Sequence, residues 1–212
     1  MAQELSGPVV FVVDDDVAVQ RLISRMLGLS GYFVQGFVSA EEFLNADFSP
    51  GVGCLVIDLH LPGLNGLELQ QALSQAGRLL PIVFITGYGD IPTSVKAMKA
   101  GAVDFLAKPF TEEALLSAIR HALERSRKEG AVKKELLKIQ ILLATLTARE
   151  AEVLPYIVAG RLNKQIAAEL GIAEQTVKIH RGRIMKKLQA RSLAELVQLA
   201  LKAELPLPPP SS

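Results

Sequence analysis

The chain has 212 residues, half of them hydrophobic, which suffices for one large or two ordinary domains with a sizeable core. Its single cysteine, Cys54, excludes a disulfide framework, and its N-terminus lacks the basic and apolar segments of a secretion signal. No apolar run is long enough to span a membrane, so we expect a cytoplasmic protein with no membrane partner.

The formal net charge of +1 conceals a division between two parts of the chain. Residues 1–125 hold 8 Lys and Arg against 14 Asp and Glu, a net charge of −6. Residues 126–212 hold 15 against 8, a net charge of +7. The basic part therefore suits a nucleic-acid partner, whereas the acidic part does not.

The first part of the chain alternates short apolar runs with amphipathic segments. We predict strands at 9–13, 33–37, 54–58, 82–86 and 104–107, and helices at 17–29, 40–46, 66–76, 92–100 and 112–125. Ser39 and Glu42 have the spacing of a capping box at the start of the second helix. The alternation predicts an α/β domain over residues 1–125, in which helices cover both faces of a parallel sheet.

Residues 126–145 are predicted to form a helical linker. Val132, Leu136, Ile139 and Leu143 recur at helical spacing, and this stripe could form a dimer seam or pack against its own domain. Gly130 disfavours an unbroken continuation of the fifth helix, so the sequence leaves open whether the linker joins it.

Residues 146–203 are predicted to form an all-α domain of four helices. Thr147 and Glu150 have capping-box spacing and open a helix that reaches about Ala159. Further helices are predicted at 164–170, 174–188 and 192–203. The Pro-rich tail, residues 204–212, is predicted to be disordered.

Polar residues follow four of the predicted strands. Asp14 and Asp15 follow the first strand, Asp58 ends the third, Thr86 ends the fourth and Lys108 follows the fifth. The carboxyl ends of parallel strands meet at one edge of a sheet, so these side chains should lie together. Asp58 could attack a phosphoryl group and form an aspartyl phosphate. Asp14 and Asp15 could hold Mg²⁺, while Thr86 and Lys108 could bind the phosphoryl oxygens.

Four segments resemble the receiver domain of two-component response regulators, over about residues 8–125. They are 12–16 (VVDDD), 57–66 (IDLHLPGLNG), 84–87 (FITG) and 100–110 (AGAVDFLAKPF). The resemblance implies a flavodoxin-like (βα)5 fold with Asp58 as the phosphoacceptor. It also implies that Asp15 and Asp58 bind Mg²⁺ directly, that Asp14 acts through water, and that the carbonyl of His60 is a backbone ligand.

The same resemblance assigns a switch to two residues and leaves one side chain without a role. Phe105 matches the aromatic residue that turns inward as Thr86 moves toward the phosphoryl group. The peptide bond between Lys108 and Pro109 is expected to be cis. The side chain of His60 is expected to be solvated.

The predicted helix 174–188 has an apolar side and a basic side. Val177, Ile184 and Leu188 fall on one face, which should be buried. The opposite face should be solvent-exposed and able to lie in a DNA major groove, because the helix follows a short helix and a glycine turn. This face holds Gln175, Lys178, Ile179, Gly182 and Lys186, with Arg183 beside them.

Five segments of the basic part resemble the LuxR-type helix-turn-helix. They are 146–150 (LTARE), 163–167 (NKQIA), 170–172 (LGI), 176–181 (TVKIHR) and 188–192 (LQARS). With the receiver, they identify the chain as similar to response regulators of the NarL/FixJ class, in particular FixJ- and StyR-like members. The resemblance implies that Lys178, Ile179 and Gly182 lie where base edges are read. Candidates for contacts to phosphates are Lys164, Thr176, His180, Arg181 and Lys186, and Gln175 lies on the DNA-facing side.

The leading interpretation is a transcription regulator controlled by phosphorylation. A sensor histidine kinase would phosphorylate Asp58, and the protein would then form a homodimer on promoter DNA, with RNA polymerase as a further candidate partner. It would not be an enzyme, apart from assisting its own phosphorylation and dephosphorylation. One alternative is a phosphatase or phosphotransferase acting on a small substrate, and another is a DNA-binding protein with a purely structural receiver.

Overall fold

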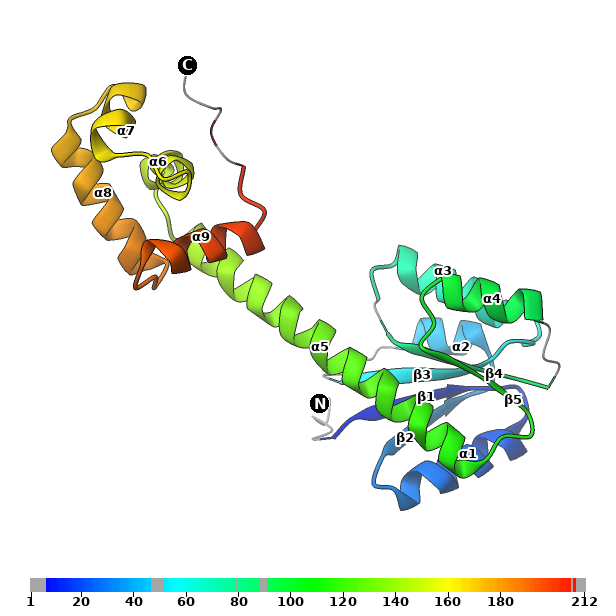
Figure 1. The fold of residues 1–212 in the computed structure, drawn as a ribbon. Helices are drawn as coiled ribbons and strands as arrows, with labels where there is room; N and C mark the ends of the chain where they lie inside the picture. Colours follow the sequence, from blue (N-terminus) through cyan, green and yellow to red (C-terminus); the bar gives the residue numbers. More distant parts are fainter. Residues whose placement is uncertain (1–6, 47–51, 79, 88–90, 207, 209–212) are drawn as a thin grey trace. The chain divides into compact units, whose positions relative to one another are not determined.

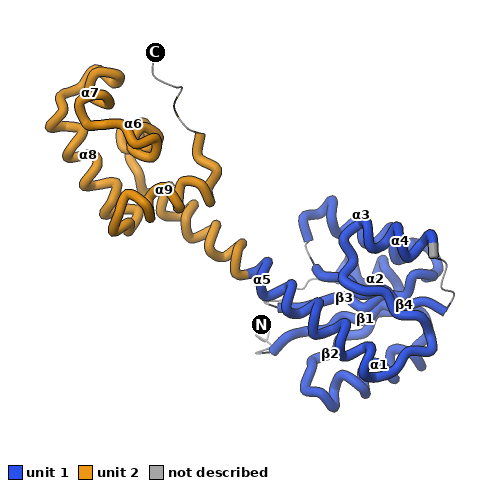
Figure 2. The backbone as a smooth tube through the Cα atoms, in the orientation of Figure 1, with its two compact units in different colours: residues 1–130 blue, residues 131–212 orange. Residues whose placement is uncertain are grey.

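The structure is a computed structural model that describes residues 7–46, 52–78, 80–87, 91–206 and 208 (Figure 1). The chain divides into two compact units, Met1–Gly130 and Ala131–Ser212 (Figure 2). The division falls inside the segment predicted to be the linker.

The first unit is built on a sheet of five parallel strands, and all five predicted strands are confirmed to within one residue. The strands are β1 (Val9–Val13), β2 (Phe33–Phe37), β3 (Gly53–Asp58), β4 (Ile82–Thr86) and β5 (Asp104–Ala107). Their order is β2-β1-β3-β4-β5, and every neighbouring pair is parallel. The strand order changes direction between β1 and β3, which is where open parallel sheets place their binding sites.

Helices cover both faces of this sheet, as the βα alternation predicts (Figure 1). One face is covered by α1 (Val17–Leu29) and the first part of α5, and the other by α2 (Ala40–Asn45), α3 (Gly66–Gln75) and α4 (Ile91–Lys99). Alternate strand residues feed the two cores, so Phe11 packs with α2 and α3 while Val10 and Val12 pack with α1 and α5. The sheet is thereby packed on both faces beneath the residues at its edge.

Helix α5 runs from Glu112 to Ala144, a length of 33 residues, so the predicted helical linker continues the fifth helix, which is one of the two possibilities that the sequence left open. Glycine in a helix interior costs about 1 kcal/mol relative to alanine. This cost is too small for Gly130 to break a helix whose neighbouring residues favour the helical conformation. Arg125 pairs with Glu129 at 2.7 Å one turn along the helix, just before Gly130. In the first unit the helix is also hydrogen-bonded to the start of β3, because the Ser126 hydroxyl accepts from the amide of Gly53 at 3.1 Å.

The second unit contains four further helices, each close to its predicted range. They are α6 (Ala148–Val158), α7 (Asn163–Leu170), α8 (Glu174–Lys187) and α9 (Leu193–Lys202). Their apolar faces meet in one core with the last turns of α5, where Leu143 is partly buried against the core and Ile139 is buried beside Leu154 and Leu188. Ile139 and Leu143 belong to the apolar stripe predicted in the linker, and both pack within the second unit. Val132, at the start of that stripe, is 66% exposed.

The start of the Pro-rich tail is ordered, against the prediction of a disordered tail from residue 204. Leu205 packs partly buried against the core of the second unit, and its amide donates to the carbonyl of Ala200 at 3.0 Å. An apolar residue next to a helix end can bury its side chain at little entropic expense. Residues 207 and 209–212 of the predicted tail lie outside the described residues.

Gly66 begins α3 in a position that leaves no room for a side chain. A Cβ there would lie 2.7 Å from the Asp58 carbonyl oxygen, 3.0 Å from the Phe84 ring and 3.1 Å from the Leu59 Cα. Two of these atoms are backbone and cannot turn away, so we expect Gly66→Ala to destabilise the first unit by about 2 kcal/mol or more. Urea unfolding should show this against Gly28→Ala, where no atom lies within 4 Å. Equal stability of the two variants would contradict the prediction.

Candidate metal centre and nucleic-acid interface

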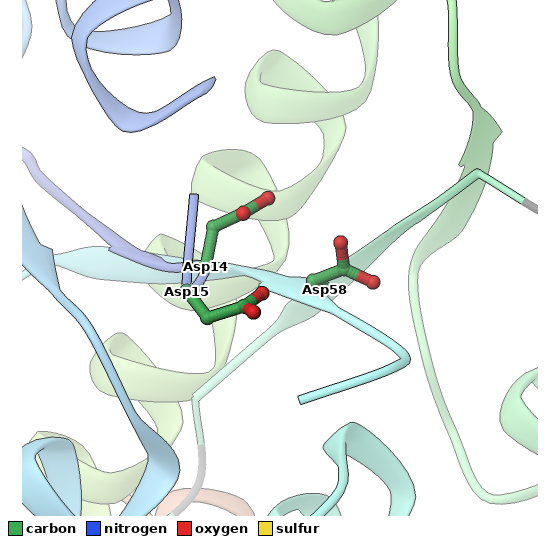
Figure 3. Close-up of side chains that lie close together, drawn as sticks. All are labelled: Asp14, Asp15 and Asp58. Carbon is green, nitrogen blue, oxygen red and sulfur yellow. The ribbon is translucent and has the colours of Figure 1, made fainter. Parts of the chain in front are cut away.

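Three carboxylates gather at the carboxyl ends of β1 and β3, as the sequence predicts (Figure 3). Asp14 and Asp15 directly follow β1, and Asp58 is the last residue of β3. One carboxylate oxygen from each lies within 4.8 Å of the others. Asp14 and Asp58 are buried while Asp15 is exposed, so the cluster is open to solvent on one side.

Lys108 joins two of these carboxylates. Its Nζ donates to Asp14 Oδ2 at 2.7 Å and to Asp58 Oδ2 at 2.5 Å. Partial burial acts to lower the pKa of Lys108, but hydrogen bonds and attraction from Asp14 and Asp58 outweigh it and raise the pKa above its ordinary value. The peptide bond to Pro109 is cis, as predicted. Lys108 is therefore a charged donor directed at the carboxylate of Asp58.

Backbone amides fix the orientation of the buried carboxylates. The amide of Asp16 donates to Asp14 Oδ1 and the amide of His60 donates to Asp58 Oδ1, both at 2.9 Å. Burial raises the pKa of Asp14, against the lowering effects of the Lys108 and Asp16 hydrogen bonds. Three carboxylates face a single ammonium, which leaves excess negative charge on hard oxygen donors. These donors fit Mg²⁺, which prefers carboxylates and water.

Thr86 and His60 make a contact that sequence reasoning missed. Thr86 ends β4 and is fully buried, and its Oγ1 lies 3.3 Å from His60 Nδ1. The imidazole is exposed as expected, yet it touches the residue assigned to the switch. Phe105, the other switch residue, is half-buried and packs against the core beneath α4.

An open cleft of about 530 Å³ lies beside the acidic cluster. Of the three carboxylates, that of Asp15 lines this cleft. Its lining combines apolar and polar side chains from the segments after β1 and β3 and from α3 and α4, namely Asp15, Leu59, His60, Leu61, Pro62, Asn65, Leu67 and Thr93.

In the second unit, α7 and α8 form the predicted helix-turn-helix. Gly171 ends α7 with φ +63°, a conformation that glycine adopts without strain, and Ile172 then donates its amide to Ala167. Val177, Ile184 and Leu188 are buried behind α8. The predicted DNA-facing residues are all exposed on the other side, namely Gln175, Lys178, Ile179, Gly182 and Lys186, with Arg183 beside them and Lys164 exposed on α7.

Three of the predicted phosphate-contacting residues lie on the flank of α8 and are half-buried, namely Thr176, His180 and Arg181. Arg181 donates to Asn163 Oδ1 at 3.2 Å, which ties α8 to the start of α7. Nδ1 of His180 is buried and has no partner among the described residues. These flanking residues of α8 therefore take part in helix packing, in addition to any contact they make with a phosphate.

Glu150 and Lys187 form a buried ion pair that the sequence reading missed. Their charged groups are 2.6 Å apart, and the Glu150 side chain is only 2% exposed. The pKa of Glu150 is lowered to about 2, chiefly by the Lys187 hydrogen bond and next by the Thr147 amide of the capping box. Lys187 also donates to the carbonyl of Thr145. Lys187 of α8 therefore stabilises the second unit through these contacts.

Helices long and apolar enough to cross a membrane do not occur in the part of the chain that the structure describes.

Comparisons with known proteins match both units. Residues 10–120 match the response regulator receiver domain, and residues 144–200 match the LuxR family of bacterial regulatory proteins. Nodulation protein W of Bradyrhizobium diazoefficiens is 46% identical over 192 residues, which is 91% of this chain and 85% of the relative. FixJ of Azorhizobium caulinodans is 42% identical over 92% of each chain. The solved structure of the response regulator StyR has a TM-score of 0.83 and 47% identity, and covers 93% of this chain and 100% of its own.

Proposed function

The chain belongs to the two-component response regulators that carry a receiver domain and a LuxR-type DNA-binding domain, and we propose that phosphorylation of Asp58 controls its binding to DNA. The observation that carries this proposal is the carboxylate of Asp58, which is oriented by the His60 amide and held 2.5 Å from the Lys108 ammonium.

In the proposed reaction, a carboxylate oxygen of Asp58 attacks the phosphorus of a phosphohistidine on a sensor kinase. The new P–O bond forms as the P–N bond breaks, and the histidine leaves with the electron pair. Asp15, Asp58 and the carbonyl of His60 would hold Mg²⁺, with Asp14 acting through water, and the ion would offset charge on the phosphoryl oxygens. Lys108 would give up its bond to Asp58 and bind one of those oxygens.

The new charge would be detected by Thr86. To reach a phosphoryl oxygen, its hydroxyl would leave the neighbourhood of His60, and Phe105 would turn into the space behind it. The surface of α4 and β5 would then change its balance of conformations. This surface exposes Val95 and Met98, each 45% accessible, which suits a homodimer contact.

A homodimer would present two copies of α8 to paired half-sites, separated by one turn of DNA or a multiple of it. Lys178, Ile179 and Gly182 would face base edges, and Lys164 and Lys186 would contact phosphates. RNA polymerase is the partner through which bound dimers would change transcription, and a cytoplasmic location follows from these partners.

The test starts from the full-length protein, acetyl phosphate and Mg²⁺. We expect one phosphoryl group per chain, detected by intact mass, with none when EDTA replaces Mg²⁺. Light scattering should then show a shift toward dimer, and fluorescence anisotropy should show tighter binding to duplexes enriched from a random pool. Labelling without a change in dimerisation or affinity would contradict the coupling, and absence of labelling would contradict the receiver chemistry.

A further inference from the structure

Gly182 occupies an interior position of α8 that neither packing nor a turn reserves for glycine. A Cβ added there would meet no atom within 4 Å, and the residue is exposed within a regular helix. Alanine would favour the helix more than glycine does, so the glycine brings no stability. The open space over Gly182 is therefore available to something outside the protein.

An apolar side chain borders this space. Ile179 lies one turn before Gly182 on the same side of α8, and the residue is 47% exposed. The other exposed residues around it are polar or charged. We call the space over Gly182, bordered by Ile179, the apolar gap.

Two lysines flank the apolar gap along the helix. Lys178 and Lys186 lie four residues before and four residues after Gly182, so the three positions form one row on the surface of α8. Both lysines are exposed. Their charges suit phosphates or guanine edges, while the gap between them allows a closer approach of the helix to the bases.

The gap has no hydrogen-bonding group of its own to offer. Ile179 is apolar, and the amide and carbonyl groups around Gly182 are used within the helix. A polar base edge placed there would lose its hydrogen bonds with water and gain none, which is unfavourable. In the major groove, thymine is the base that presents a methyl group.

We propose that the apolar gap receives the C5 methyl group of a thymine in each half-site. The methyl group would contact Ile179 on one side and the bare helix backbone of Gly182 below it, in the space that an alanine methyl would fill. The inference rests on the proposed DNA-binding function and adds a specificity-determining pair of residues to it.

The probe is a duplex enriched from a random 30-base-pair pool with the full-length protein phosphorylated by acetyl phosphate. Each thymine of that duplex is replaced singly by deoxyuridine, which removes the methyl group and nothing else. We expect one thymine in each half-site at which the replacement weakens binding about fourfold, the effect of one buried methyl group. Replacement at both half-sites should weaken binding by about fifteenfold.

Two variants test the residues. Ile179→Ala should bind the thymine and deoxyuridine duplexes equally. Gly182→Ala places a methyl group in the gap, so it should lose the preference for thymine or reverse it, while the domain melts several degrees higher. Gly28→Ala, another exposed helical glycine with no atom within 4 Å of its Cβ, should keep the fourfold preference.

Three results overturn the inference. The first is a wild-type protein that binds both duplexes equally at every position, and the second is a Gly182→Ala variant that keeps the full preference for thymine. The third, a wild-type protein that enriches no duplex, contradicts DNA binding itself and is recognised before any deoxyuridine is introduced.

Discussion

Replacing Asp58 with asparagine is expected to abolish uptake of a phosphoryl group from acetyl phosphate. The amide has nearly the shape of the carboxylate but no anionic oxygen to attack phosphorus. Asp58 is 7% exposed and lies between the His60 amide and the Lys108 ammonium, an arrangement that no other carboxylate has in the part of the chain that the structure describes. Intact mass should show no added phosphoryl group, and DNA affinity should stay at its unphosphorylated value.

Asp16→Asn is the matched control for this prediction. Asp16 is an exposed neighbour that caps α1 by accepting from the amide of Ala18 at 2.8 Å. Asparagine caps helices about as well as aspartate, so this variant should be phosphorylated like the wild type. Equal phosphorylation of the Asp58 and Asp16 variants would place the phosphoacceptor elsewhere in the cluster.

Replacing Glu150 with glutamine is expected to destabilise the second unit by about 3 kcal/mol. The change leaves the Lys187 ammonium beside a neutral amide, and removing one partner of a buried ion pair is strongly unfavourable. The Lys187 side chain is 33% exposed, so water compensates part of the loss and the effect falls at the low end of the usual range. Glutamine can still complete the capping box with Thr147, which isolates the effect of the charge.

Glu152→Gln provides the comparison on the same helix. Glu152 pairs with Arg149 at 2.5 Å, but its side chain is 51% exposed. Exposed pairs contribute little, so urea unfolding should place this variant within about 0.5 kcal/mol of the wild type. If Glu150→Gln and Glu152→Gln lower the free energy of unfolding by the same amount, the burial of Glu150 does not account for the effect.

The same ion pair should make the stability of the second unit depend on pH. The pKa of Glu150 falls from 4.5 to about 2 on folding, so the unfolded chain binds this proton more readily. The contribution of the ionised Glu150 to the free energy of unfolding is fully present above about pH 4.5 and is lost as the pH falls toward 2. The wild type should therefore lose more stability than Glu150→Gln between these pH values.

Most element boundaries of both units follow from the sequence, because apolar periodicity and local capping signals act over short distances. The five strands are continuous apolar runs that end in polar residues, and a parallel sheet brings those ends together. This is why Asp14, Asp58 and Lys108 could be assigned to one site before their contacts were known. The capping box at Thr147 is found where predicted, and Ser39 caps α2 by accepting from the Glu42 amide, although the Glu42 carboxylate accepts from the amide of Val38 and not from that of Ser39.

The contacts that could not be predicted from the sequence depend on packing between elements that are distant in the chain. Glu150 and Lys187 are separated by 37 positions and meet because α6 packs on α8, which no local pattern encodes. The contact of His60 with Thr86 depends on the path of the chain after β3. The length of α5 stayed open in the sequence, because Gly130 disfavours a helix while the residues around it favour one, and the structure shows a single helix through it.

If α8 reads DNA as proposed, the separation of its packing residues from its outward residues bears on how operator preference can change over evolution. Residues that hold the domain together, Val177, Ile184 and Lys187, lie on or beside its buried side, while the outward positions support no packing. Drift at the outward positions is therefore nearly free of folding constraint. On the proposed DNA-binding role, gene duplicates of such a chain could acquire new target promoters by a few surface changes, without first accumulating compensatory mutations in the core.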